Sequence, residues 1–238
     1  MPNLTTWMDR RLYPHHAGHW DDTLFRETVL RHLRPEMRLL DLGAGAGILP
    51  QMNFRGLASE VIGVDLDERV VHNPNLDRGI VTAGESIPLG DNEVDMVVSA
   101  NVLEHLARPE VVFSEIRRVL RPGGVFFAKT PNKWHYMPLI ARTTPMSFHR
   151  WFNQLRGRAS EDTFPTLYRA NSRRDIHRIS SRSGLELVRA DLVEGRPEYM
   201  RISPVFYLAG FAYERLVNLT DLTDFLRILL ILQLRKPA

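Results

Sequence analysis

The sequence predicts an α/β fold in which a parallel sheet is doubly wound and carries helices on both faces. Three observations predict it. Short apolar segments alternate along the chain with segments of helical spacing. The segment Val94–Ser99 is apolar in its middle, as a parallel strand buried on both faces should be. The first apolar segment, Leu39–Leu42, leads into glycines at positions 43, 45 and 47, a turn that open α/β sheets place after a strand.

Hydrophobic spacing and terminal signals predict the individual elements. Pro109 at a first turn and Gly123-Gly124 after the end delimit one helix, and Asn171 or Ser172 provides the N-cap of another. The predicted helices are Asp22–Leu33, Ile48–Leu57, Pro109–Leu120, Asn171–Ser183 and Pro204–Leu219. The predicted strands are Arg38–Leu42, Glu60–Val64 (ending at Asp65), Gly79–Ala83, Val94–Ser99, Val125–Lys129, Leu185–Glu194 and Phe225–Leu234.

The segment Trp134–Ala170 interrupts this alternation with three prolines and scattered aromatic residues. An insertion of that length in a compact domain usually has a function, so we expect a lid after the fifth strand. The 238 residues are expected to form one domain. Its parts are an N-terminal arm and helix (1–35), a core that binds a cofactor (36–133), the lid (134–170), and C-terminal strands with an apolar helix (171–238).

Composition narrows the class of protein. Cysteine is absent, so disulfides and thiolate chemistry are excluded, and neither a signal peptide in Met1–Trp20 nor an apolar run of bilayer length is visible. These features predict a cytoplasmic protein without a transmembrane segment. The net charge is +3, and Arg142–Arg182 holds nine arginines against three acidic residues. That run is either a solvated basic face or a site for an anionic acceptor. Aromatic residues do not alternate with the arginines as in a nucleic-acid-binding motif, so we expect no nucleic-acid partner.

Two carboxylates accompany the glycine turn. Asp41 precedes it on the strand, where it could accept a hydrogen bond from an amino group or order the turn. Asp65 closes the second strand, where a carboxylate can take both hydroxyls of a ribose. A dinucleotide fingerprint would need Gly or Ala at the position of Ile48. The turn therefore predicts a nucleotide-like cofactor and departs from the dinucleotide pattern.

In order and spacing, a series of motifs resembles the class I S-adenosylmethionine-dependent methyltransferases, of the broad small-molecule branch. The resemblance covers about Met37 to Lys129. It implies a Rossmann-like, seven-stranded, mostly parallel sheet with one antiparallel strand, and S-adenosyl-L-methionine as cofactor. The motifs that carry it are Leu39–Gly47, Val61–Leu66, Ala83–Leu89, Glu93–Val98, Leu103–Leu106 and Arg118–Gly124.

The same resemblance implies roles for particular residues. The backbone of Gly43, Ala44 and Gly45 would lie against the methionine part of the cofactor. Asp65 would hold the ribose; the alternative is a cap of a short helix over Asp67–Val71. The remaining implied contacts are Leu66 against adenine, Glu85 and Ser86 at the adenine edge, and Asn101 near the sulfonium, with a plain loop charge as the alternative for Glu85.

Histidines are the candidate general bases, because a hydroxyl or amine acceptor benefits from loss of its proton. His105, after the fourth strand, is the first candidate; the alternative is that it orders the loop 101–107. His135, after the fifth strand, is the second. Asn101-x-x-Glu104-His105 also resembles a metal cluster of some O-methyltransferases, but Asn in the first position is a weaker ligand. We therefore expect no metal there, nor at His15, His16 and His19 on the arm.

The expected function is S-adenosylmethionine-dependent O-methylation of a small molecule or of a glycan or lipid-linked precursor, with an anionic group favoured by the arginines of the lid. The alternatives are an NAD-dependent oxidoreductase and a non-catalytic cofactor-binding or interaction module. The apolar segment Val205–Leu219 is a core helix, a dimer face or a shallow membrane contact. The sequence leaves the oligomeric state and the methylated atom open.

Overall fold

The structure is a computed structural model that describes residues 4–14, 19–143 and 165–238. The chain divides into two units. The sheet unit comprises residues 22–130, 166–191 and 230–238, and the helical unit comprises residues 1–21, 131–165 and 192–229.

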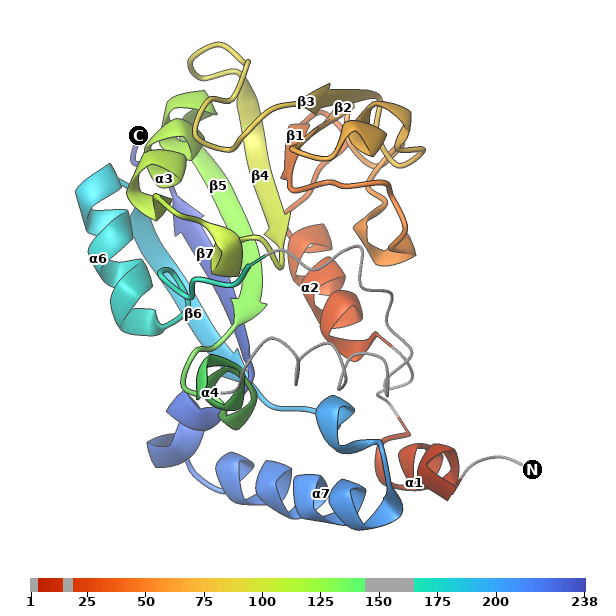
Figure 1. Ribbon diagram of the computed structural model, residues 1–238. Coiled ribbons are helices and arrows are strands. Elements are labelled where there is room, and N and C mark those ends of the chain that lie inside the picture. The colour runs from red at the N-terminus through yellow and green to blue at the C-terminus, as the bar shows by residue number, and fades with distance from the viewer. Residues whose placement is uncertain (1–3, 15–18, 144–164) are drawn as a thin grey trace. The chain divides into compact units, whose positions relative to one another are not determined.

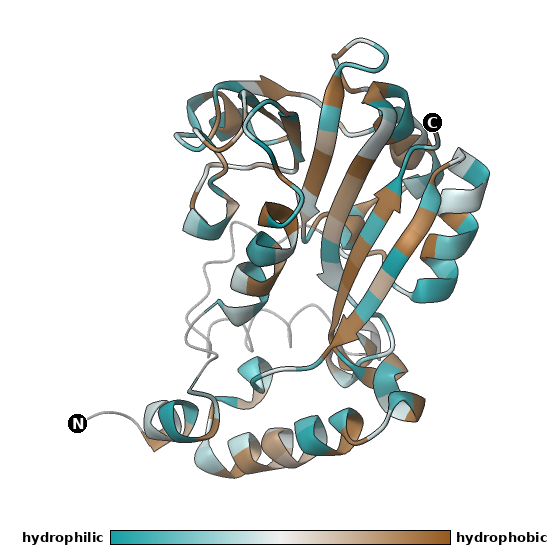
Figure 2. Cartoon of the chain, turned by 180° about the vertical axis from the view of Figure 1, so that it is seen from behind, coloured by the Kyte–Doolittle hydropathy of each residue, from teal (hydrophilic) through white to brown (hydrophobic). Residues whose placement is uncertain are grey.

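A seven-stranded sheet, in the order β3-β2-β1-β4-β5-β7-β6, is the frame of the sheet unit (Figure 1). Its strands are β1 (Arg38–Leu42), β2 (Glu60–Asp65), β3 (Arg78–Val81), β4 (Val94–Ala100), β5 (Leu120–Pro131), β6 (Glu186–Val193) and β7 (Leu229–Arg235). The five strands from β3 to β5 are parallel neighbours. Apolar residues concentrate along the central strands (Figure 2). The chain order reverses between β1 and β4, where such sheets bind ligands at the carboxyl ends of the strands.

The pairing of β5 with β7 is antiparallel. Gly123, near the start of β5, donates its backbone N–H to Lys236, just after β7. At the other end of β5, Asn132 donates to Ile228, just before β7. The two strands therefore run in opposite directions, which confirms a mostly parallel sheet with one antiparallel strand.

Two neighbouring residues of β5 show that helices cover both faces of the sheet. Side chains of successive strand residues point to opposite faces. Phe126 packs edge-on against Phe113 of α3 (Pro109–Val119), with ring centroids 5.6 Å apart. Phe127 contacts His32, just after α2 (Trp20–Leu30), at 5.0 Å. Helix α6 (Arg173–Ser183) packs beside α3 (Figure 1).

One predicted helix is wrong. In place of a helix over 48–57, the chain forms only a single 3-10 turn, η1 (Pro50–Met52). Leu49 and Asn53 on either side are extended, and Ile48 is 70% exposed, so no continuous helical backbone exists there. The guanidinium of Arg26 on α2 donates to the carbonyls of Gln51 and Asn53, at 2.8 and 2.6 Å. A cation from outside the segment thus satisfies the carbonyls that a helix would have paired.

The other element boundaries differ from the predictions by a few residues. Strand β5 is longer than predicted because it takes in Arg121–Gly124, whereas β3 already ends at Val81. The predicted last strand begins with a 3-10 helix, η6 (Asp221–Leu226), which Thr220 caps by accepting from Leu222 N–H. Ser172 rather than Asn171 caps α6.

Helices dominate the helical unit. They are α1 (Leu4–Leu12), α4 (Tyr136–Thr143), η5 (Glu198–Met200), α7 (Pro204–Asn218) and η6. Met8 and Tyr13 pack with Tyr207 to form a core between α1 and α7. Most of the predicted lid, with Arg150, Arg156 and Arg158, lies outside the described residues, as do His15 and His16. In the described part of the chain, no helix combines the length and apolar character needed to cross a bilayer.

Candidate functional site

The glycine turn after β1 is held by close packing on two of its three glycines. Gly43, Gly45 and Gly47 all have positive φ (82°, 52° and 73°), which L side chains rarely adopt. A Cβ at Gly43 would lie 2.1 Å from Val102, and one at Gly47 would lie 2.2 Å from Asn73. At Gly45 the nearest heavy atom would be Asp65 Oδ2, at 3.9 Å. The turn is therefore packed on either side and open at its centre, where a ligand can approach the backbone.

Asp65 joins the end of β2 to this turn. Its Oδ2 accepts from Gly45 N–H and its Oδ1 accepts from Asp67 N–H, both at 2.8 Å. The cap of the following 3-10 helix, η2 (Glu68–His72), is Asp67, which accepts from Arg69 N–H at 2.9 Å. The alternative that Asp65 is the helix cap is therefore wrong, since Asp67 fills that position. The carboxylate of Asp65 is oriented by two backbone donors and retains lone pairs for a ligand.

Asp41 is a buried carboxyl at the carboxyl end of β1. It is 3% exposed, and its Oδ1 forms no hydrogen bond with the described residues. Burial, and then the charge of Asp65, raise the pKa of Asp41 to about 7. A buried acceptor without a donor is costly, and a cationic or N–H group of a ligand would relieve that cost. The carboxyl oxygens at this edge can accept hydrogen bonds, and they thus fit a ligand that donates from hydroxyl groups and an amine.

Two asparagines that the sequence analysis missed hold the turn from the loop before β3. Asn73 donates through Nδ2 to the carbonyls of Ala44 and Gly45, at 2.9 and 3.0 Å. Asn75 donates to the carbonyl of Gly47 at 3.1 Å. Because these bonds take the carbonyls, the turn's geometry does not depend on a following helix. A run of asparagine and proline at 73–75 is a turn signal that could have indicated this loop, though not its partner.

The remaining candidate cofactor contacts lie on loops in the sheet unit. Leu66 and Ser86 are exposed, and Glu85 is partly buried with its Oε1 3.9 Å from Arg108 Nε. Asn101 is exposed with a positive φ of 58°, and its backbone N–H donates to the backbone carbonyl of Lys129 at 2.9 Å. Asp65 is the last residue of β2 and Leu66 follows it, Glu85 and Ser86 follow β3, and Asn101 follows β4. All of them therefore lie at or after the carboxyl ends of parallel strands, at one edge of the sheet.

A buried polar chain lies under the loop after β4. Thr130 donates to Glu104 Oε2 at 2.9 Å, and Asn171 donates to Thr130 Oγ1 at 2.6 Å. The backbone carbonyl of Glu104 accepts from Leu167 and Tyr168 N–H, at 2.7 and 3.1 Å. Burial raises the pKa of Glu104. Residues from two other segments, the end of β5 and residues 167–171, thereby fix the loop that carries His105.

Lys129 is a second buried charge that the sequence analysis did not assign. Its ammonium is fully buried near the end of β5 and pairs with the buried carboxylate of Asp22 on α2. A lysine at the end of the apolar run Val125–Ala128 was the available signal, because a buried amine requires an acidic partner. The pair ties α2 to the same edge of the sheet.

The two candidate histidines belong to different units. His105 is partly exposed in the sheet unit, with Nε2 4.0 Å from Glu104 Oε1. His135 belongs to the helical unit, where Nδ1 accepts from Met137 N–H at 3.2 Å and Nε2 lies 3.5 Å from Glu194 Oε2. Burial lowers the pKa of His135 to about 3 and raises that of Glu194 to about 8. His135 is therefore a weak base.

No group of three or more His, Asp or Glu side chains suited to a metal ion occurs among the described residues.

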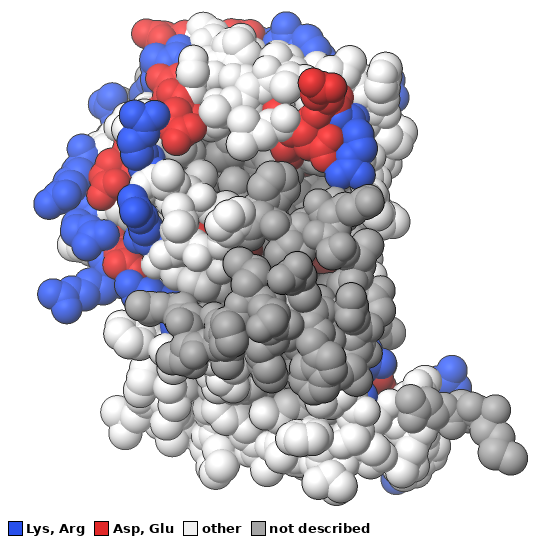
Figure 3. All heavy atoms as spheres, in the orientation of Figure 1, with Lys and Arg blue, Asp and Glu red and all other residues white. Residues whose placement is uncertain are grey.

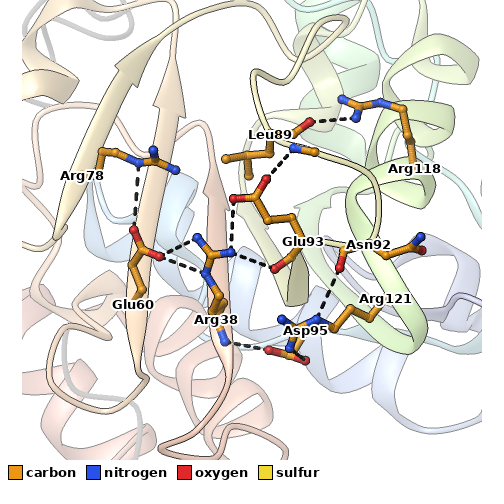
Figure 4. Close-up of polar contacts among 10 residues, drawn as sticks. Arg38, Glu60, Arg78, Leu89, Asn92, Glu93, Asp95, Arg118 and Arg121 are labelled. Atoms are coloured by element: carbon orange, nitrogen blue, oxygen red, sulfur yellow. Dashed lines mark hydrogen bonds and ion pairs between the residues drawn. The ribbon is translucent and has the colours of Figure 1, made fainter.

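At the opposite edge, the amino ends of the strands carry a network of ion pairs (Figure 4). Arg38, the first residue of β1, donates to Glu60 of β2 at 2.7 Å and lies 3.1 Å from Glu93 before β4. Asp95 of β4 accepts from Arg38 N–H at 2.8 Å and from Arg121 at 2.7 Å. These side chains connect the starts of neighbouring strands and pair with one another, which is a structural role.

Comparison with known proteins finds a family match within the sheet unit. Residues 40–128 match the family model described as a methyltransferase domain. A probable S-adenosylmethionine-dependent methyltransferase of Mycolicibacterium smegmatis is 39% identical over 117 residues, 47% of this chain and 44% of that protein. A ubiquinone/menaquinone biosynthesis C-methyltransferase of Burkholderia multivorans is 37% identical over 103 residues, 39% of this chain and 42% of that protein. The chain thus spans about half the length of the curated relatives it matches.

A solved structure shares the fold. It is the methyltransferase in complex with the Trm112 activator of Haloferax volcanii, with a TM-score of 0.59 at 19% identity over 98% of this chain and 97% of that one. The family match, the relatives and the topology agree with the motifs around the glycine turn, and they decide against the dinucleotide alternative. Residues 40–128 match a methyltransferase domain, and this part of the chain is similar to S-adenosylmethionine-dependent methyltransferases.

Proposed function

We propose that this chain transfers a methyl group from S-adenosylmethionine to a small-molecule acceptor. The observation that carries the proposal is the pair of carboxyls at one sheet edge. Asp65 is oriented by Gly45 N–H, and Asp41 is buried with an oxygen that accepts no hydrogen bond from the described residues. When bound, the cofactor supplies a methyl group activated by a sulfonium leaving group. Asp65 holds the ribose hydroxyls, and Asp41 faces the amino group, whose positive charge stabilises the ionised carboxylate.

The loops around these carboxyls complete the cofactor site. The backbone of Gly43, Ala44 and Gly45 approaches the methionine part, as the open space at Gly45 allows. Leu66 covers adenine, which would bury part of its large exposed surface. Glu85 and Ser86 lie at the adenine edge and Asn101 lies near the sulfonium, as the family resemblance implies.

For the acceptor, we propose an oxygen of a small molecule or of a glycan or lipid-linked precursor. His105 takes the proton of the acceptor hydroxyl, because it is partly exposed and stands beside Glu104, which stabilises the imidazolium. The fixed loop under it limits the orientations of the ring. Proximity and alignment in a dry site then account for much of the acceleration.

A second candidate is methylation at carbon. It is favoured by the relative from Burkholderia multivorans, a C-methyltransferase that is 37% identical over 103 residues. A carbon nucleophile of an enol or phenol also benefits from a base, so His105 does not distinguish the two. The atom that carries the new methyl group in the product distinguishes methylation at oxygen from methylation at carbon.

Binding and product analysis test the proposal. Calorimetry on the full chain with S-adenosylhomocysteine and with NADH should show binding of the first only. A screen of acceptors with isotopically labelled methyl donor, followed by mass spectrometry and NMR of the product, then locates the methyl group on oxygen or on carbon. Binding of S-adenosylhomocysteine without turnover of any acceptor would favour the non-catalytic module, and binding of neither ligand would contradict both enzyme hypotheses.

A further inference from the structure

Helix α7 is apolar on two opposite sides. One side packs inside the helical unit through Tyr207, Gly210 and Val217. The opposite side carries apolar residues at helical spacing that are exposed to solvent, and we name this set the α7 stripe. It consists of Val205, Leu208, Ala209, Ala212, Leu216 and Leu219. A helix that is apolar on two opposite sides normally has an apolar environment on both, and the described residues provide it on one side only.

The exposure is large and continues beyond the helix. Val205 is 77% exposed and Leu219 is 74% exposed, and Leu222 of η6 reaches 86%. On α1, which packs against α7, Trp7 is also 58% exposed. In Figure 3 the surface over the middle of α7 is white, without acidic or basic side chains. Large apolar exposure along one face of a helix indicates an interaction surface.

On α1 and α7 the acidic side chains are buried and the basic side chains are exposed. Both acidic residues of these helices are buried: Asp9 accepts from Tyr207 and Arg201, at 2.8 and 2.7 Å, and Glu214 accepts from Tyr13 at 3.0 Å. The charged residues that the two helices expose are Arg10, Arg11 and Arg215, and Arg215 is paired with Glu214, with Nε 3.2 Å from Oε2. Nearby, the exposed Asp221 of η6 has an ion-pair partner in Arg227, at 3.7 Å.

We infer that the α7 stripe docks on the surface of an anionic lipid bilayer, with Leu222 and Trp7 inserted beside it. An apolar helix face bordered by arginine and tryptophan is the composition of helices that lie in a membrane interface. A symmetric contact with a second copy would bring the same patch of each copy, with its arginines, against itself. Anionic headgroups instead neutralise Arg10 and Arg11 while the acyl chains cover the stripe. The inference does not depend on the proposed methyl transfer.

Vesicle binding by the full chain, without methyl donor or acceptor, tests the inference. We expect co-sedimentation with vesicles of phosphatidylcholine and phosphatidylglycerol, and weak binding to phosphatidylcholine alone. The double variant Leu216→Glu/Leu219→Glu should bind the mixed vesicles at least about tenfold more weakly, because two leucines that enter the bilayer are lost. The matched control is Leu57→Glu/Val188→Glu, which changes exposed apolar residues of the sheet unit and should bind as the wild type does.

A second pair of variants probes the charge. Arg10→Gln and Arg11→Gln should each weaken binding to the mixed vesicles about fivefold and leave the weak binding to phosphatidylcholine unchanged. Circular dichroism and light scattering on every variant establish fold and mass. Equal vesicle binding by the wild type and the stripe variant would overturn the inference. So would a wild-type dimer that the stripe variant dissociates and that fails to bind vesicles, which would assign the face to self-association.

Discussion

The two edges of the sheet are built from the same strands and use charge in opposite ways. At the amino ends, Arg38 pairs with Glu60 and Glu93, and Arg121 pairs with Asp95, all partly exposed (Figure 4). At the carboxyl ends, Asp41 is buried with an oxygen that no described residue satisfies. At the amino ends, these charged side chains pair with one another. At the carboxyl ends, the ionised form of Asp41 would be stabilised by a ligand that donates a hydrogen bond or carries a positive charge.

This difference follows from solvent access. A partly exposed ion pair gains little, about 0–1 kcal/mol, because water and salt screen it. A buried charge is expensive unless it is paired. Removing one partner of a buried pair therefore lowers the free energy of unfolding strongly, because the other charge stays buried without compensation. Substitutions at the carboxyl edge should therefore have much larger effects than substitutions at the amino edge.

The largest effect should follow from breaking the buried pair of Lys129 and Asp22. Lys129→Met leaves the Asp22 carboxylate buried without its partner, and we expect the free energy of unfolding to fall by about 3–5 kcal/mol. Urea unfolding measures it. The double variant Lys129→Met/Asp22→Asn should recover part of the loss, whereas Arg235→Met, which breaks an exposed pair with Glu186, should cost less than about 1 kcal/mol. Equal losses in the two single variants would contradict the comparison.

Asp41 should make the stability of the ligand-free protein fall as pH rises. The pKa of Asp41 is about 7 in the folded protein and near the ordinary value of 3.8 when unfolded, so the folded state binds the proton more tightly. Below about pH 4 Asp41 is protonated in both states and does not destabilise the folded protein. Between about pH 4 and pH 7 the unfolded state loses the proton first, so the free energy of unfolding falls as pH rises. Asp41→Asn should remove this slope and be more stable than the wild type at pH 8 by about 2–4 kcal/mol.

Chemical unfolding of both proteins between pH 4 and pH 8 checks this expectation. Asp91→Asn, a change at an exposed carboxylate, should keep the wild-type slope. S-adenosylhomocysteine, whose amino group is cationic, should stabilise the wild type more than Asp41→Asn at pH 8. A wild-type profile that runs parallel to that of Asp41→Asn would show that this carboxyl titrates as an ordinary one.

Asp65→Ala should weaken binding of S-adenosylhomocysteine by about 1.5–3 kcal/mol, because two charge-assisted hydrogen bonds are lost. Gly45 N–H also loses its acceptor, so the turn becomes less ordered. Calorimetry measures the affinity, and Asp91→Ala is the matched control. An unchanged dissociation constant would refute the role of Asp65 in the cofactor site.

The smallest effect is expected at the amino edge. Glu60→Gln weakens the contacts with Arg38 and Arg78, which are partly exposed, and should lower the free energy of unfolding by less than about 1 kcal/mol. Added salt should reduce even that difference. Affinity for S-adenosylhomocysteine should be unchanged. A loss of affinity comparable to that of Asp65→Ala would show that the two edges are not independent.

Much of the carboxyl edge could be predicted from the chain alone. The strands around the glycine turn are found within about two residues of their predicted ends, because buried parallel strands produce short apolar runs that little else resembles. The position of Asp65 followed from the same pattern. Asn73 could not be assigned, since its partners at Ala44 and Gly45 are almost thirty residues away and a loop asparagine carries no sign of its acceptor.

The helix predicted over 48–57 shows the limit of local patterns. Its apolar spacing suggested a helix, but Arg26 takes the carbonyls of Gln51 and Asn53, and Asn73 and Asn75 take those of the glycine turn. A cation on another helix thus replaced hydrogen bonds that the segment would have made internally. Local propensity is weak compared with such contacts, and they appear only when distant segments are brought together.

By itself the sequence determined the order of strands along the chain, the glycine turn and the family, because these depend on residue type and on short spacings. Only the tertiary structure decided which carboxyls are paired and which are not, that Lys129 finds Asp22, and that α7 exposes an apolar face opposite its buried one. The reason is that burial and pairing depend on neighbours far apart in the chain. The chemistry of a carboxyl or an apolar face is set by what surrounds it in the folded protein.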